Sequence, residues 1–280
     1  MVPSGVAKGA YAMPNTTRSR TRALLQALLV TFLWSTSWVL IKRTLTELPP
    51  LIFAGLRYTL AAVVLLPGLF RRRAEVRALT RADWLRLVAL GLVLYTLTQG
   101  GQFVTLRHLE AVTFSLVLNF TSVLVALAGI WTLHERPGRL QWLGVALFGV
   151  GAIGYFWGGA ALTGRTLGLV LACLTMGANA GASLLGRWVN RGQRLTPLVV
   201  TGTSMGVGAV VMLVLGLVIE GWPSISLRSW AVILCLAGVN SALAFTLWNR
   251  SLVVLSAVES SVINNTMLIQ IAVLAWAFLG

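Results

Sequence analysis

Two segments decide the fold of this chain: AVTFSLVLNF, residues 111–120, and AVESSVINNT, residues 257–266. A shift of 146 residues aligns four pairs of identical residues without a gap: Trp84 with Trp230, Ala111 with Ala257, Ser115 with Ser261, and Asn119 with Asn265. Leucine matches are common by chance in so apolar a chain, so the Trp and Asn pairs carry the comparison. We interpret the pattern as an internal repeat, with chance alignment as the alternative.

The composition indicates a membrane protein. Of the 280 residues, 57% are hydrophobic and 10% are charged, whereas soluble domains carry roughly 25% charged residues. Apolar runs recur that are long enough to cross a hydrocarbon core of about 30 Å as helices, and they are too continuous for barrel strands. We therefore predict an all-α polytopic membrane protein with nine spans, at 23–41, 51–69, 84–106, 111–132, 141–159, 167–186, 198–219, 230–249 and 257–280.

The basic residues predict the orientation. The net charge is +15, but 16 of the 22 Lys and Arg residues lie in the tail at 1–22 and in alternate connections between the spans. The positive-inside rule explains this better than nucleic-acid binding. We expect a flexible basic cytoplasmic tail at 1–22, a cytoplasmic N-terminus and location in the inner (plasma) membrane. The cysteines, Cys173 and Cys235, suggest no disulfide framework or metal site.

The repeat predicts how the helices are organised. With five spans in the first copy, the second copy enters the membrane inverted, as in transporters that alternate around a midplane site. We expect repeats at 23–159 and 160–280. The offset pairs Glu135 with position 281, one past Gly280, so the second repeat is expected to lack its fifth helix, leaving nine helices of ten.

The motifs resemble a known family. LWSTSW at 33–38, PPLIFAGLRY at 49–58 and LHERPGRLQWLGVALFGVGAI at 133–153 are similar in order and spacing to the EamA-type domain of the drug/metabolite transporter superfamily. The resemblance implies ten helices in two inverted halves and secondary transport of small metabolites, often export of amino acids or drugs. Arg57 and Glu135 match positions where that family usually carries Arg and Glu, whereas His134 stands where glycine is usual.

Polar and aromatic side chains inside the spans form the candidate substrate site. Such groups usually face other helices or a water-filled cavity, and helix glue is the alternative to solute binding. The predicted substrate-binding residues are Trp34, Trp38, Tyr95, Gln99, Gln102, Asn119, Asn179, Trp248 and Asn265. Asn264 lies about 100° around the helix from Asn265 and is expected to bond a neighbouring helix instead.

Charged residues leave several roles open. Arg57 is expected to snorkel outward, to hold helix-end carbonyls or to bind a substrate carboxylate. Glu110 and Glu259 are expected to stabilise helix N-termini, with coupling to a proton as the alternative. Glu135 is expected to form a cytoplasmic anchor.

Catalytic signatures are weak. GTSMG at 202–206 fits G-x-S-x-G but lies in an apolar helix, so we interpret Gly202 and Gly206 as a helix-packing face, like Gly177 and Gly181. No metal, cofactor or ATP site is expected. The favoured function is a secondary transporter of a small organic solute, with a lipid-modifying enzyme or a non-transporting scaffold as alternatives.

Overall fold

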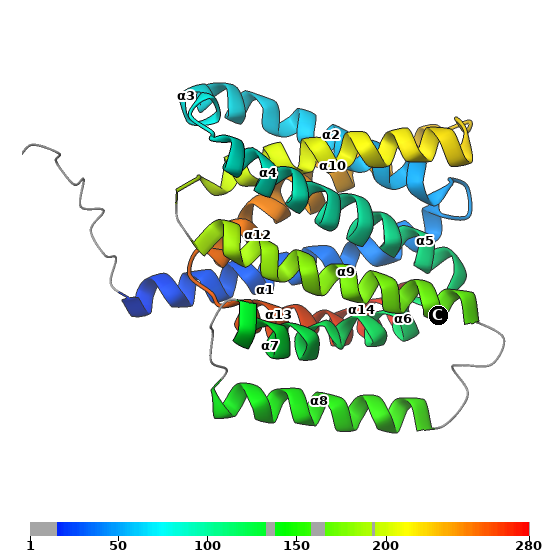
Figure 1. Cartoon of the computed structure of the whole chain (residues 1–280). Helices are drawn as coiled ribbons and strands as arrows, with labels where there is room; N and C mark the ends of the chain where they lie inside the picture. Colours follow the sequence, from blue (N-terminus) through cyan, green and yellow to red (C-terminus); the bar gives the residue numbers. More distant parts are fainter. Residues whose placement is uncertain (1–15, 133–137, 158–165, 192–193, 280) are drawn as a thin grey trace, which may run out of the picture.

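The computed structural model describes residues 16–132, 138–157, 166–191 and 194–279, and the described chain is helical with no strand (Figure 1). The helices are α1 Thr16–Thr44, α2 Pro50–Arg71, α3 Arg73–Arg77, α4 Arg81–Leu90, η1 Gly91–Gln99, α5 Gly100–His108, α6 Ala111–Asn119, α7 Thr121–Thr132, α8 Arg139–Trp157, α9 Thr166–Arg191, α10 Pro197–Glu220, α11 Leu227–Cys235, η2 Leu236–Leu243, α12 Ala244–Leu252, α13 Ala257–Asn265 and α14 Met267–Leu279.

Eight continuous helical stretches among the described residues are long and apolar enough to cross a membrane. They confirm an all-α polytopic membrane protein, and they coincide with eight of the nine predicted spans. The remaining prediction, 141–159, falls on α8, whose described apolar part, Trp142–Gly151, is shorter than the others. This helix lies at the edge of the bundle, where it contacts α13 (Figure 1). A ninth span therefore stays a prediction.

Helix boundaries repeat at the offset found in the sequence. Helix α6 begins at Ala111 and ends at Asn119, and α13 begins at Ala257 and ends at Asn265, 146 residues later in both cases. The third and seventh candidate spans, Arg81–His108 and Leu227–Leu252, each contain a π-helical segment, η1 or η2. In Figure 1, α1 runs opposite to α9, and α2 runs opposite to α10. Both features are those of an inverted repeat.

Helices α2 and α10 form the most extensive contact between the halves. Each N-terminus is capped from the other half. The Glu220 carboxylate accepts hydrogen bonds from the backbone N–H groups of Leu51 (3.2 Å) and Ile52 (2.9 Å) at the start of α2. Glu75 likewise accepts from the Thr196 backbone N–H and from its hydroxyl (3.0 Å) before α10. These carboxylates satisfy N–H groups that a helix leaves unpaired at its start.

Glycines allow α10 to approach both α2 and η1 closely. A Cβ on Gly55 would lie 2.7 Å from the Leu213 Cα atom, and one on Gly208 would lie 2.2 Å from the Gly91 carbonyl oxygen. The predicted glycine face was correct only in part. Gly202 contacts Leu69, but a Cβ on Gly206 would meet no atom within 4 Å.

The remaining glycine prediction also fails at one position. A Cβ on Gly177 would meet nothing within 4 Å, whereas one on Gly181 would touch the Val93 side chain at 3.8 Å. The tightest approaches of these glycines to neighbouring backbone therefore lie where α2, α10 and η1 cross, which a spacing of four residues does not reveal.

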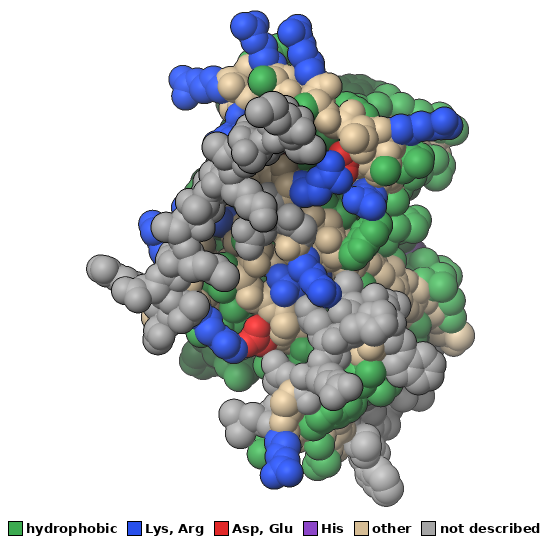
Figure 2. All heavy atoms as spheres, turned by 60° about the vertical axis from the view of Figure 1, so that its left-hand side comes forward, with side chains coloured by type: hydrophobic (Ala, Val, Ile, Leu, Met, Phe, Trp, Pro, Cys, Tyr) green, Lys and Arg blue, Asp and Glu red, His purple; other side chains and the backbone are tan. Residues whose placement is uncertain are grey.

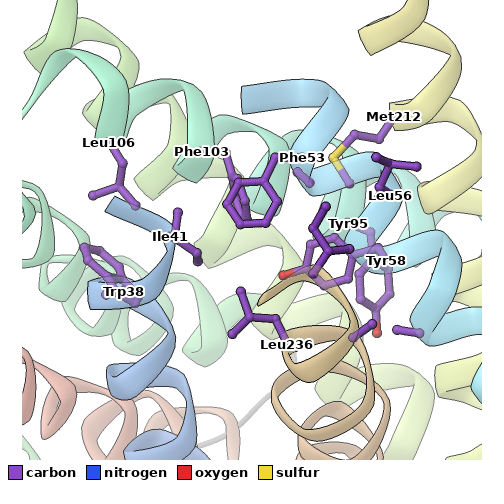
Figure 3. Packing of buried hydrophobic residues seen from close by; sticks show 14 of the residues in the cluster. Trp38, Ile41, Phe53, Leu56, Tyr58, Tyr95, Phe103, Leu106, Met212 and Leu236 are labelled. Carbon is purple, nitrogen blue, oxygen red and sulfur yellow. The ribbon is translucent and has the colours of Figure 1, made fainter. Parts of the chain in front are cut away.

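An aromatic and aliphatic core lies where α1, α2, η1, α5 and η2 meet (Figure 3). Phe53 and Phe103 pack edge to face with ring centroids 5.1 Å apart, and Tyr58 and Tyr95 lie 5.5 Å apart. All four side chains are almost completely buried. Rings packed in this way hold α2 against α5 and against η1.

Arginines gather at one end of the bundle. Helix α2 ends with Arg71, α4 begins with Arg81, α9 ends with Arg191 and the last turn of α12 carries Arg250. These ends lie together on the left of Figure 1, and Figure 2 shows the basic side chains there. The clustering agrees with the predicted charge asymmetry.

Candidate functional site

A cavity of about 90 Å³ lies among the helices of the bundle. Its walls come from both halves: α1, α2, η1, α5, α6 and α7 of the first, and α9, α12, α13 and α14 of the second. Eight of the predicted residues line it: Trp34, Trp38, Arg57, Gln99, Gln102, Asn119, Asn179 and Trp248. The helices therefore bring together most of the polar and aromatic side chains that the spans distribute along the sequence.

One wall of the cavity is aromatic. The Trp34 ring lies 4.8 Å from that of Phe245 and 5.2 Å from that of Trp248, measured between centroids. The Trp34 indole N–H donates a hydrogen bond of 3.1 Å to the Asn240 carbonyl oxygen in η2. On the other side, Trp38 stacks on Phe114 at 5.4 Å. Such a wall can contact the flat or aliphatic body of a solute.

Arg57 crosses between the two halves. Its Nε donates to the Ser241 hydroxyl at 2.8 Å, and a terminal nitrogen donates to the Asn240 carbonyl oxygen at 3.3 Å. The guanidinium carbon also lies 5.1 Å from the centroid of the Tyr58 ring. The side chain is only 2% exposed, so the expectation that it snorkels outward is wrong. It holds a carbonyl, but that carbonyl belongs to a π-helix rather than to a helix end.

The two π-helical segments border this site. A π-helix changes the backbone hydrogen-bond register, and such segments occur frequently at functional sites. The Asn240 carbonyl in η2 accepts hydrogen bonds from both Trp34 and Arg57. At the end of η1, Gln99 accepts a hydrogen bond of 2.6 Å from the Tyr58 hydroxyl through Oε1. Thus η1 contributes Gln99 to the cavity lining, and η2 lies behind the lining and holds Arg57 through Ser241 and Asn240.

Tyr95 lies behind the cavity wall rather than in it. Its ring is fully buried and packs 5.5 Å from Tyr58 and 5.1 Å from Phe245, between centroids. Tyr95 is not among the described residues that line the cavity. Of the predicted stripe in that span, Gln99 and Gln102 line the cavity, whereas Tyr95, within η1, does not.

The adjacent amides of α13 take roles opposite to those expected. Asn265 donates a hydrogen bond of 2.6 Å to the Ser122 hydroxyl of α7 and does not line the cavity. Asn264 lines the cavity, and its Oδ1 is buried without a hydrogen-bond partner among the described residues. The sequence indicated that these two side chains point in different directions, but it could not decide which of them faces the cavity.

Asn119 and Asn179 use their amide donors within the protein. Asn119 donates to the Ser115 carbonyl oxygen at 2.6 Å, and Asn179 donates to the Thr121 hydroxyl at 3.2 Å. Both residues also line the cavity. The Asn119 bond lies within α6, whereas the Asn179 bond joins α9 to α7, so only Asn179 acts as helix glue here. In both side chains the carbonyl oxygen can still accept a hydrogen bond from a solute.

The acidic candidates lie outside the cavity lining. Glu110 is exposed at the N-terminus of α6. Glu259 forms a capping box with Ser256 at the start of α13 and pairs with Arg20 of α1. Favourable charge at a helix N-terminus accounts for both positions. Glu135 lies outside the described residues, so its predicted anchoring role stays a prediction.

Sequence reasoning missed Asn240 and Asn249. Asn240 is buried and its amide donates to the Leu33 carbonyl oxygen. Asn249 lines the cavity, donates to Thr201 at 2.9 Å and accepts from Asn190 at 2.8 Å. The signal was available, because an amide within an apolar span was the criterion that selected Asn119.

The GTSMG segment lies within α10 and forms no strand–turn–helix.

Helical membrane spans that surround a polar cavity built from both halves define a polytopic membrane protein of the transporter class. A model of the EamA-like transporter family matches the chain twice, over residues 21–157 and 166–280. The chain belongs to the EamA-like transporter family. The two matches also correspond to the two copies found in the sequence, while the boundaries at 23–159 and 160–280 stay predictions.

Individual relatives agree with this assignment. An uncharacterized transporter of Synechocystis is 30% identical over 252 residues, which is 82% of this chain and 74% of that protein. An S-adenosylmethionine/S-adenosylhomocysteine transporter of Chlamydia trachomatis is 25% identical over 272 residues, 92% of this chain and 82% of that protein. One crystal structure shares the fold, with a TM-score of 0.71 and 18% identity over 92% of this chain and 89% of that one.

Proposed function

We propose that this chain is a secondary transporter that moves a small organic metabolite by alternating access, in the export direction. The observation that carries the proposal is a polar cavity lined by both inverted halves within a membrane-spanning bundle. Two oppositely oriented units can open such a site to either side of a membrane in turn. Export follows the family resemblance, and the basic end of the bundle is proposed to be cytoplasmic in the inner membrane.

The proposed solute is an amino acid or another small amphipathic molecule. The cavity joins an aromatic wall at Trp34 and Trp248 to amides at Gln102, Asn119 and Asn179. Such a lining can contact an apolar body and hydrogen-bond polar ends. The named activity of the Chlamydia relative makes S-adenosylmethionine one member of a suitable panel of solutes.

Counterflow in proteoliposomes tests the proposal. Vesicles loaded with each unlabelled solute should accumulate the same labelled solute only when they contain the protein. The variant Ser183→Trp places a bulky ring in the cavity lining on α9 and should abolish counterflow. Leu174→Trp, at a position 67% exposed on the same helix, is the matched control and should transport normally. Undiminished counterflow by a well-folded Ser183→Trp variant would contradict the central cavity as the transport site.

Coupling to a proton is a separate part of the proposal. The described cavity lining contains neither a carboxylate nor a histidine, so Glu110 or Glu259 would have to supply a titrating group from a helix end. Imposing a pH gradient across the vesicles tests this directly. Uptake driven by the gradient in wild type and lost in Glu259→Gln would support a coupling role, whereas uptake indifferent to the gradient would remove it.

A further inference from the structure

Arg57 gives the cavity an unbalanced charge. Among the described residues that line it, Arg57 is the one with a full charge, and the remaining members are apolar, aromatic, hydroxyl or amide side chains. No ion pair joins Arg57 to any carboxylate in the described chain. A cation that is 2% exposed and lacks a counter-ion retains a large cost of desolvation. An anionic group entering the cavity would offset that cost.

The guanidinium is held in place from the other half. Ser241 and Asn240 of η2 accept its hydrogen bonds at 2.8 and 3.3 Å, and Tyr58 and Phe103 flank it with centroids 5.1 and 5.9 Å from its central carbon. Both hydrogen-bond acceptors are neutral. A guanidinium has more N–H donors than these two contacts use, and its planar fork matches a carboxylate. The site is therefore preorganised for a compact anion before any solute arrives.

A second group favours a zwitterion over a simple anion. Asn264 lines the cavity on α13, and its buried Oδ1 has no partner among the described residues. A carbonyl oxygen of this kind accepts a hydrogen bond from an ammonium or amine donor. It offers a hydrogen bond but no counter-charge, so a cationic amine would gain little from it while being repelled by Arg57.

We propose that the cavity selects solutes bearing a carboxylate, bound by Arg57, and discriminates against solutes whose only charge is an ammonium group. The selectivity rests on the proposed transport function, because it assigns a substrate class to the same cavity. The selectivity also narrows the range of solutes proposed for transport. Amino acids fit the site, whereas amphipathic amines without a carboxylate do not.

Matched acid and amide pairs test the selectivity on the wild-type protein. Binding of leucine, methionine and phenylalanine would be compared with binding of their carboxamides by isothermal titration calorimetry in detergent. The acids should bind at least about tenfold more tightly, since hydrogen bonds to charged groups are the strong ones. Carboxamides that bind as tightly as the acids would overturn the proposal, and so would a failure of all three acids to bind.

Two variants assign the preference to Arg57. Arg57→Gln should collapse the difference between acid and amide, and Arg57→Lys should retain part of it because the charge stays while the planar fork is lost. Arg43→Gln removes an equal charge at an exposed position outside the cavity lining and should keep the full preference. Retention of the preference in Arg57→Gln would overturn the assignment. Should Arg57→Gln not fold, Ser241→Ala replaces it, because this variant keeps the charge of Arg57 but removes its 2.8 Å anchor. An unaltered preference for acids in Ser241→Ala, together with tight amide binding by wild type, would count against the assignment to Arg57.

Counterflow separates this proposal from the broader one. Transport of amines with rejection of carboxylates would leave the transporter assignment standing and refute the selectivity. Tight, Arg57-dependent binding of acids without counterflow of any solute would refute transport and leave the anion site standing.

Discussion

Replacing Gly208 with alanine should separate α10 from η1. A Cβ at this position would lie 2.2 Å from the Gly91 carbonyl oxygen and 2.7 Å from the Tyr95 Cβ atom. The first of these atoms belongs to the backbone of η1 and cannot move alone, so the two helices must shift. Overpacking of this kind costs typically about 1–3 kcal/mol, and a contact this short belongs at the upper end of that range.

The expected change can be separated from helix propensity. Alanine gains about 1 kcal/mol over glycine in a helix interior, so Gly208→Ala should lose about 2 kcal/mol of unfolding free energy. Gly206→Ala lies two residues away on α10, where a Cβ would meet nothing within 4 Å. This control should be neutral or more stable by up to about 1 kcal/mol.

Unfolding in mixed micelles with increasing dodecyl sulfate, followed by circular dichroism, measures both variants under the same conditions. Gly208→Ala should unfold at a lower mole fraction of dodecyl sulfate than wild type, and Gly206→Ala should not. Equal transitions for the two variants would refute the packing of Gly208 against Gly91. Because η1 also carries Gln99 to the cavity, solute binding should weaken in Gly208→Ala and stay unchanged in Gly206→Ala.

Three further predictions concern polar contacts. Hydrogen bonds from the Ser229 and Ser226 hydroxyls lower the pKa of Glu47 below its ordinary value of 4.5, so this carboxylate stabilises the fold at neutral pH, and the contribution is lost as the pH falls through the lowered pKa. Glu47→Gln should therefore lower the melting temperature at pH 7 but not at a pH below that pKa. An equal effect at both pH values would contradict the contact. Glu220→Gln should lose about 0.5–2 kcal/mol of unfolding free energy, as removal of a helix cap does. The same dodecyl sulfate titration measures this loss, and an unaltered transition would show that α2 does not depend on this cap. Asn265→Ala should destabilise the protein by about 0.6 kcal/mol through loss of its hydrogen bond between helices. Asn264→Ala should reduce solute binding in calorimetry without this loss of stability. The reverse result would restore the roles expected from sequence.

The helical spans and their repeat could be predicted because they depend on local chemistry. Long apolar runs must form helices in lipid, since their backbone groups have no other partners there. The match between Asn119 and Asn265 likewise predicted equivalent positions in the two copies, and both residues end a short helix, α6 or α13, within predicted spans that were taken as continuous. These features follow from hydropathy and from alignment of the chain with itself, and neither requires knowledge of how the helices pack.

The orientation of individual side chains could not be predicted in the same way. The π-helical segments η1 and η2 look like ordinary helix in sequence. In the structure, Tyr95 of η1 lies behind the cavity wall, and the Asn240 carbonyl of η2 accepts from both Trp34 and Arg57. Asn264 and Asn265 differ only by which one meets a hydroxyl of α7. Such choices depend on contacts between segments more than 100 residues apart, so the periodicity of one span does not contain them.

The two halves are alike in architecture and different in chemistry, and this division matches the demands of alternating access. The paired contacts of α2 and α10 are nearly symmetrical, with Glu220 capping one helix and Glu75 the other. A symmetrical scaffold allows the halves to exchange conformations at similar free energy. The cavity lining breaks the symmetry, because the 146-residue shift pairs Arg57, which lines the cavity, with Thr203, which is not among the described lining residues. A single solute needs one charged anchor in a fixed place rather than two related by a half-turn. Arg57 satisfies that need from α2 while its hydrogen bonds end on η2. The residue proposed to hold the solute therefore also joins the two halves that the proposed alternating access would move.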